Sequence, residues 1–156
     1  METDLHFMRL ALGEASLAAS LGEVPVGAVL VHRGVVLASG HNRRETLQSP
    51  IAHAEVAVIE RAAAAMGTWR LTECTLYVTL EPCLMCIGAT ILARVPRLVF
   101  AARDPKAGAV CSLYSCANDP RLNHRIEVVE GLLGEESAAL LSEFFRNLRQ
   151  AKQAKS

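Results

Sequence analysis

The chain has 156 residues, of which 51% are hydrophobic, and its 16 basic residues balance 16 acidic ones. This length and apolar content fit one domain with a sizeable core and exclude an intrinsically disordered chain. The zero net charge argues against indiscriminate nucleic-acid binding, although a local basic surface is compatible with it.

The compartment is predicted from charge and cysteine content. No uncharged apolar run approaches the roughly 18 residues of a membrane span, so we expect no membrane contact. Charges at Glu2, Asp4, Arg9 and Glu14 replace the apolar stretch of a signal peptide. Five cysteines, an odd number, fit a reducing compartment better than a disulfide scaffold. We therefore expect a cytoplasmic protein whose residues 1–156 form a single domain.

The hydrophobic periodicity and the turn residues predict helices alternating with strands. In chain order we expect a helix over 4–21, a hairpin of strands over 26–31 and 35–39, a helix over 51–66, a strand over 76–80, a helix over 83–93, a strand over 98–102, a strand over 126–129, and a helix over about 135–150.

This order predicts an α/β fold. Strands that alternate with helices after an initial hairpin indicate a three-layer α/β/α arrangement around a mixed five-stranded sheet. The later helices would connect its parallel strands. Ligands bind at the strand ends of such sheets, and the strand over 76–80 leads directly to Pro82 and Cys83.

Two short motifs carry the chemistry. His53-Ala54-Glu55 is followed about thirty residues later by Pro82-Cys83-Leu84-Met85-Cys86. One imidazole and two thiolates suit zinc, and Glu55 is not needed as a ligand. Three protein ligands leave a tetrahedral position open for a water, whose protons a nearby carboxylate could move. The motifs predict one zinc ion per chain and a hydrolytic reaction.

The ligand spacing places both motifs at helix starts. We expect His53 and Glu55 in the first turn of the helix over 51–66, where side chains can project past the helix end. Cys83 and Cys86 would share a face of the next helix. Helix N-termini stabilise thiolates and a developing hydroxide.

Two alternatives explain the same ligands without hydrolysis. A fourth protein ligand would close the site into a structural zinc centre and leave Glu55 as an ordinary surface carboxylate. The candidates for that ligand are Cys74, Cys111, Cys116, His41 and His124. A redox dithiol is less favoured, because the motif lacks a thioredoxin-like context and comes with an upstream histidine and glutamate.

The motif pair and predicted fold resemble the cytidine deaminase superfamily of zinc nucleobase deaminases. Further stretches are similar to the bacterial tRNA-specific adenosine deaminases, and the likeness runs almost the full length. They are residues 23–31, 41–43, 79–83, 101–108, 123–125 and 142–146. Arg44 departs from the family pattern, which often has proline there, and Cys111 and Cys116 lie in a loop where small or apolar residues are expected.

The resemblance implies a homodimer that converts adenosine at the anticodon wobble position, position 34 of a tRNA, to inosine. By matching motif, His53, Cys83 and Cys86 would hold zinc. Zinc-bound hydroxide would attack C6 of adenine, while Glu55 protonates N1 and assists the departure of ammonia.

The resemblance also implies a substrate-binding set. Asn42 and the segment containing Val26 and Ala28 would seat the base, Leu80 and Glu81 would frame the catalytic turn, and Asp104 would lie near the target ribose. Four of these residues have a structural alternative: Val26 and Ala28 also fit a core strand, and Asn42 and Asp104 also suit turns.

The chain ends with aromatic and basic residues. Phe144 and Phe145 cannot both face the core at adjacent helical positions. One of them, exposed beside Arg146, would stack on a splayed anticodon stem-loop, with Arg146 and Arg149 reaching its phosphates. A solvated C-terminal helix explains the same charges.

Two competing functions remain open at this point. A guanine or cytosine deaminase, acting on a free base or nucleoside, would keep the zinc and Glu55 but would not need the aromatic and basic C-terminal end. A non-catalytic zinc module would hold the metal through four protein ligands.

Overall fold

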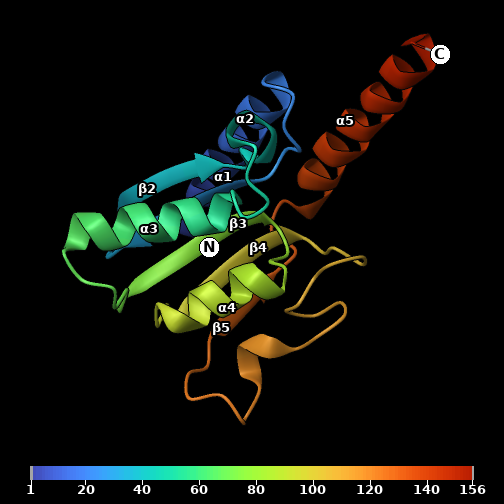
Figure 1. Ribbon diagram of the computed structural model, residues 1–156. Helices are drawn as coiled ribbons and strands as arrows, with labels where there is room; N and C mark the ends of the chain where they lie inside the picture. The colour runs from blue at the N-terminus through green and yellow to red at the C-terminus, as the bar shows by residue number, and fades with distance from the viewer. Residues whose placement is uncertain (1, 156) are drawn as a thin grey trace.

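The computed structural model describes residues 2–155. They form a five-stranded sheet of order β2-β1-β3-β4-β5 with helices packed against it (Figure 1). The strands are β1 (Gly27–His32), β2 (Val35–His41), β3 (Cys74–Leu80), β4 (Arg97–Ala102) and β5 (Glu127–Glu130). β1 pairs antiparallel with both β2 and β3, whereas β3, β4 and β5 are mutually parallel. The mixed sheet and the first hairpin predicted from the sequence are confirmed.

Helices cover both faces of the sheet. α3 (Ala54–Met66) and α4 (Leu84–Leu92) pack on one face, and α1 (Glu2–Ser20) packs on the other with the start of α5 (Gly134–Lys155). Two short elements were not predicted, α2 (Arg44–Leu47) and the 3₁₀ turn η1 (Cys116–Asn118). Each is too short to show a helical period in the sequence.

The sheet is buried on both sides, so alternate residues of each strand enter different cores. Leu30, Leu76 and Leu98 pack against α3 and α4, whereas their neighbours Val29, Tyr77 and Val99 pack against α1. Such continuous apolar strands are typical of sheets covered by helices on both faces. The three layers thus follow directly from the strand sequences.

α1 lies unusually close to the sheet at one point. A Cβ atom at Gly27 would overlap the backbone carbonyl of Ala11, so only glycine allows this approach. Farther along, Asp4 accepts hydrogen bonds from the Tyr77 hydroxyl at 2.6 Å and from both terminal nitrogens of Arg97 at 2.8 Å. These contacts fix the helix against β3 and β4.

The starts of the two helices that carry the ligand motifs were predicted too early. The helix expected from residue 51 begins at Ala54, and His53 is its N-cap residue with extended backbone angles of −84° and 152°. The helix expected from Cys83 begins at Leu84, and Cys83 is likewise an N-cap. His53 and Cys83 therefore precede the first turns of their helices, and their side chains meet beside the two helix starts.

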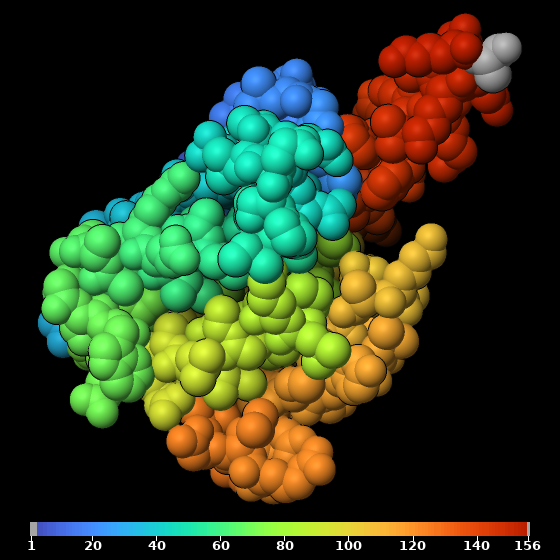
Figure 2. Space-filling model, viewed as in Figure 1, coloured from blue at the N-terminus to red at the C-terminus, as the bar shows by residue number. Residues whose placement is uncertain are grey.

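α5 is longer than predicted because its last turns are rich in alanine, lysine and glutamine, which favour helix. It stands clear of the body of the protein over much of its length (Figures 1 and 2). Within residues 2–155, no helix combines the length and apolar character that crossing a bilayer requires.

Candidate active site

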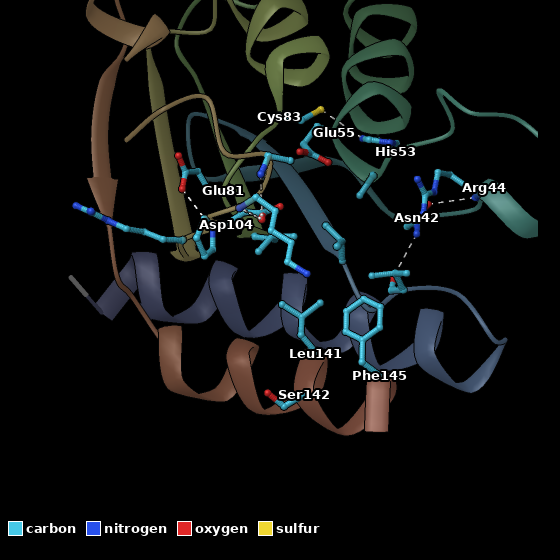
Figure 3. A pocket seen from close by; sticks show the side chains of 18 residues that line it. Asn42, Arg44, His53, Glu55, Glu81, Cys83, Asp104, Leu141, Ser142 and Phe145 are labelled. Atoms are coloured by element: carbon cyan, nitrogen blue, oxygen red, sulfur yellow. Dashed lines mark hydrogen bonds between the residues drawn. The ribbon is translucent and has the colours of Figure 1, made fainter. Parts of the chain in front are cut away.

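A cavity of about 680 Å³ opens where β3 and β4 end. β3 leads through Glu81 to Cys83, and β4 leads to Asp104. The β1–β2 hairpin contributes Val26 before β1 and Asn42 after β2. Figure 3 shows His53, Glu55 and Cys83 together at one end of this cavity, with Leu141 and Phe145 approaching from α5. Its position at the carboxyl ends of parallel strands is where α/β sheets bind ligands.

The structure brings the three predicted metal ligands together. Nδ1 of His53 lies 3.7 Å from Sγ of Cys83 and 3.4 Å from Sγ of Cys86. Ligands bound tetrahedrally to zinc are separated by about 3.5 Å, given Zn–N and Zn–S bonds of about 2.0 and 2.3 Å. The donor chemistry and the spacing therefore both fit a zinc ion.

The group remains open on one side. All three ligand atoms lie within 4.8 Å of one another, and no further His, Cys, Asp or Glu side chain of residues 2–155 joins the group. The five candidates for a fourth ligand, Cys74, Cys111, Cys116, His41 and His124, are absent from it. This geometry disfavours the closed structural site considered above.

The contact between the two thiols shifts their pKa values in opposite directions. The Cys86 thiol donates a hydrogen bond that, together with His53, lowers the pKa of Cys83 to about 3. The same contact and burial raise the pKa of Cys86. Conversely, the hydrogen bond with Cys83 raises the pKa of His53. Because thiols bind metal as thiolates, metal binding at this group is coupled to the release of protons.

Glu55 lies in the first turn of α3 beside these ligands but is not one of them. Its side chain is only 4% exposed, and burial raises its pKa to about 7, against the opposing effects of its own backbone N–H and of His53. A carboxyl group poised near neutral pH can both accept and donate a proton, as acid–base catalysis requires.

Six of the predicted substrate-binding residues line the cavity, and four do not. The lining residues are Val26, Asn42, Leu80, Glu81, Asp104 and Phe145. Ala28 is fully buried in the core on the α3 side, which agrees with its structural alternative. Phe144 instead lines a groove between α1 and α5.

Arg146 and Arg149 lie outside the cavity but continue the face of α5 that borders it. Ser142 and Phe145 line the cavity, and residues four apart in a helix lie one above the other. Arg146 therefore follows Ser142, and Arg149 follows Phe145, one turn farther from the body. Both arginines are exposed.

Asn42 and Asp104 have turn contacts in addition to their place in the cavity. The side-chain oxygen of Asn42 accepts a hydrogen bond from the Arg44 N–H at 3.1 Å. Asp104 accepts the N–H groups of Lys106 and Ala107 at 3.0 and 3.3 Å. These contacts hold both side chains at the cavity wall.

Sequence reasoning missed several cavity residues, including Val24, Arg44, Lys106 and Leu141. The sequence carries a signal for two of them, because Arg44 departs from the family pattern and Lys106 lies within a stretch similar to the family. Leu141 could have been found because it lies one helical turn before Phe145. Within residues 2–155, neither Arg44 nor Lys106 forms an ion pair.

Comparison with known proteins gives full-length matches. Residues 2–149 match the model of the MafB19-like deaminase family. A tRNA-specific adenosine deaminase of Bacillus subtilis is 53% identical over 154 residues, which cover 99% of this chain and 96% of the relative. Another from Aquifex aeolicus is 45% identical over 144 residues, covering 92% of this chain and 95% of the relative.

Similar solved structures are also deaminases. A chain from a study of A-to-I editing by tRNA:A34 deaminases at the wobble position matches with a TM-score of 0.84 and 49% identity, covering 87% of this chain and 99% of its own. A guanine deaminase from Nitrosomonas europaea matches with a TM-score of 0.76 and 28% identity, covering 90% of this chain and 83% of its own. The predicted cytidine deaminase-like fold is confirmed, and the chain belongs to the tRNA-specific adenosine deaminase family.

Proposed function

We propose that this protein is a zinc-dependent enzyme that converts adenosine to inosine at the wobble position, position 34, of a tRNA anticodon. The observation that carries the proposal is the open group of His53, Cys83 and Cys86 beside the buried Glu55, in a chain 53% identical to a tRNA-specific adenosine deaminase. The arrangement suits hydrolytic removal of an amino group from a base held in the cavity.

One zinc ion per chain would be held by Nδ1 of His53 and the two Sγ atoms. When bound, zinc supplies a Lewis acid that ionises water near neutral pH. The protein contributes the shape of the site: α3 and α4 begin next to each other and present their N-cap ligands to one point. The free N–H groups of both helix starts stabilise negative charge there.

Glu55 would move the protons of the reaction. Its buried position holds the carboxyl group against the cavity, where N1 of adenine and the departing amine can reach it. It would take one proton from the water whose oxygen bonds to C6 and deliver it to N1. It would then carry the remaining proton of that oxygen to the amine, so that the C6–N bond breaks, ammonia leaves and inosine remains. Because the group is not needed to bind metal, it remains free for both transfers.

The remaining cavity residues would bind the nucleotide. Val26, Leu80 and Phe145 offer apolar surface to a flipped base, and the Asn42 amide, with Asp104, offers polar contacts to the base and ribose. Arg44 and Lys106 at the wall would attract the adjoining phosphates. Arg146 and Arg149 extend the same positive surface along α5, toward an anticodon stem.

The protein would act as a homodimer in the cytoplasm. α4 exposes Leu84 and Leu92 at 54% and 71%, and Leu47 and Ile51 are also exposed near the site. A second copy covering such apolar surface would be stabilised by its burial. Light scattering is expected to show a dimer. The cytoplasmic location rests on the tRNA substrate and on the five unpaired cysteines.

Guanine deamination is the second candidate, because a guanine deaminase shares the fold at a TM-score of 0.76. Its lower identity of 28% and the cationic residues beside this cavity favour the RNA substrate. Measuring inosine in a wobble-adenosine stem-loop, in parallel with release of ammonia from free guanine and cytosine, separates the two.

A further inference from the structure

One wall of the cavity is the segment after β2, which includes the short helix α2, and the other is the loop after β4; each rests on one buried carboxylate. One wall carries Asn42 and Arg44, and the other carries residues 103–107. Glu23 and Glu81 are 0% and 2% exposed and belong to different parts of the chain. A charged group this deeply buried must be satisfied by several donors.

Glu81 is surrounded by donors from a single loop. Its Oε1 accepts the Asp104 N–H at 3.0 Å and the Ser112 hydroxyl. Its Oε2 accepts the N–H groups of Val110, Cys111 and Ser112 at 3.1, 2.7 and 2.9 Å. Five donors use the roughly four lone-pair directions of a carboxylate, so none is left for a substrate.

Gly108 shows that this loop is shaped around the carboxylate. A Cβ atom at Gly108 would overlap the Glu81 carboxyl group, whereas its φ angle imposes no need for glycine. The glycine is therefore required by the close packing of the loop on Glu81. The loop N–H groups and the carboxylate form one tightly fitted unit.

Glu23 holds the opposite wall in the same way. Its oxygens accept the Glu45 N–H at 3.1 Å and both the N–H and the hydroxyl of Thr46 at 2.6 Å. These donors follow directly after Arg44, and Asn42 is tied to the same segment through Arg44 N–H. Glu23 lies between α1 and β1, so it anchors this wall to the body of the fold.

We propose that Glu23 and Glu81 are positioning residues, which hold the two substrate-binding loops in their bound geometry before the RNA arrives. The proposal rests on the proposed function. Preorganised loops lower the entropy cost of binding, and a displacement of about 1 Å can cost on the order of 100-fold in rate. A neutral amide cannot replace the carboxylate, because its NH₂ group would face N–H donors.

The test uses the full-length, metal-loaded enzyme with Glu81→Gln, Glu23→Gln and Gly108→Ala. Each variant should raise the KM for a wobble-adenosine stem-loop by about 10- to 100-fold, with a smaller change in kcat. Glu81→Gln and Gly108→Ala disturb the same contact, so their double variant should be little worse than either one. Glu81→Gln and Glu23→Gln act on separate walls, so their effects should multiply.

Controls separate this role from general stability. Glu73→Gln removes an exposed carboxylate, and Gly13→Ala adds a methyl group where nothing lies within 4 Å; both should leave KM unchanged. Hydrogen exchange provides a readout independent of activity. The N–H groups of residues 110–112 should exchange at least about tenfold faster in Glu81→Gln, and those of Glu45 and Thr46 in Glu23→Gln, while core amides stay protected.

The outcomes are distinct. If the amides of both loops exchange at the wild-type rate in the glutamine variants, and KM is also unchanged, the positioning role is overturned, whatever the substrate. Faster loop exchange in an enzyme that forms no inosine would support the loop anchors and overturn the proposed function instead.

Discussion

Nδ1 of His53 lies 3.4 Å from Sγ of Cys86, although the two residues are 33 positions apart in the chain. The contact exists because α3 and α4 pack on the same face of the sheet and begin at the same end of it. β3 separates the two helices in sequence and carries the second ligand motif to the first. The metal group is thus a product of the sheet topology.

This arrangement predicts a metal site that depends on both cysteines of the motif. Cys86→Ala and Cys83→Ala should each lose the one zinc per chain that we expect in the wild type, because two protein ligands bind zinc much more weakly than three. Metal analysis by mass spectrometry on the purified proteins measures this directly.

The other cysteines provide the control. Replacing Cys74, Cys111 and Cys116 together should leave one zinc per chain and measurable activity, since none of them lies in the ligand group. Loss of zinc in that variant would mean that the site is closed by a fourth ligand and that the catalytic interpretation is wrong.

Glu55→Gln should separate chemistry from binding. The amide preserves the shape of the buried side chain but cannot shuttle protons, so kcat should fall on the order of 10²- to 10⁴-fold. Zinc content and the melting temperature should change little. Glu60→Gln, on the exposed face of the same helix, is the matched control. An active Glu55→Gln enzyme contradicts the proposed role.

The sequence predicted the metal group and the fold for different reasons. His53, Cys83 and Cys86 were found because their residue types and spacing are limited by zinc chemistry. The strands were found because short apolar segments are bounded by turn residues. The helix starts were misplaced, because the proline and apolar residues near Ile51 continue the helical pattern while His53 takes an extended backbone.

The roles within the cavity were harder to predict. Ala28 and Val26 are two residues apart, so both would lie on the same side of a strand, yet only Val26 borders the cavity because β1 begins after it. For Glu81, the sequence shows a charged residue next to a ligand motif, but its partners lie 23 to 31 positions away. Such long-range contacts leave no local pattern.

Phe144 and Phe145 should differ in their effects on RNA turnover. Phe145 borders the cavity, so Phe145→Ala should raise the KM for a wobble-adenosine stem-loop by about 10-fold or more, since loss of base stacking costs about 1–3 kcal/mol. Phe144 borders the groove between α1 and α5, so Phe144→Ala should mainly lower the melting temperature. Equal KM values for Phe145→Ala and the wild type would remove this residue from the substrate contacts.

The contact of Asp4 with Arg97 and Tyr77 predicts an acid-dependent contribution to stability. Hydrogen bonds from Arg97, helped by Tyr77 and opposed by burial, lower the pKa of Asp4 to about 2. Because this value is below the roughly 3.9 of an unfolded chain, the stabilisation is complete above about pH 4 and disappears as the pH falls toward 2.

Asp4→Asn should therefore lower the free energy of unfolding by about 1–2 kcal/mol at pH 7, with a smaller difference at pH 2 to 3. Urea denaturation at several pH values provides the measurement, with Glu60→Gln as a control that keeps the wild-type profile. A pH-independent difference between Asp4→Asn and the wild type would mean that the ion pair is not its cause.

The most direct test of the account is the substrate itself. The zinc-loaded protein is incubated with an anticodon stem-loop carrying adenosine at the wobble position, and with equal concentrations of free adenosine, cytosine and guanine. Inosine should form in the stem-loop far faster than any free compound is deaminated, because the loop presents an unstacked base and the cavity is bordered by cations. Glu55→Gln controls for contaminating deaminases. Rapid turnover of guanine or cytosine, with no inosine in a panel of wobble-adenosine stem-loops, would contradict the account.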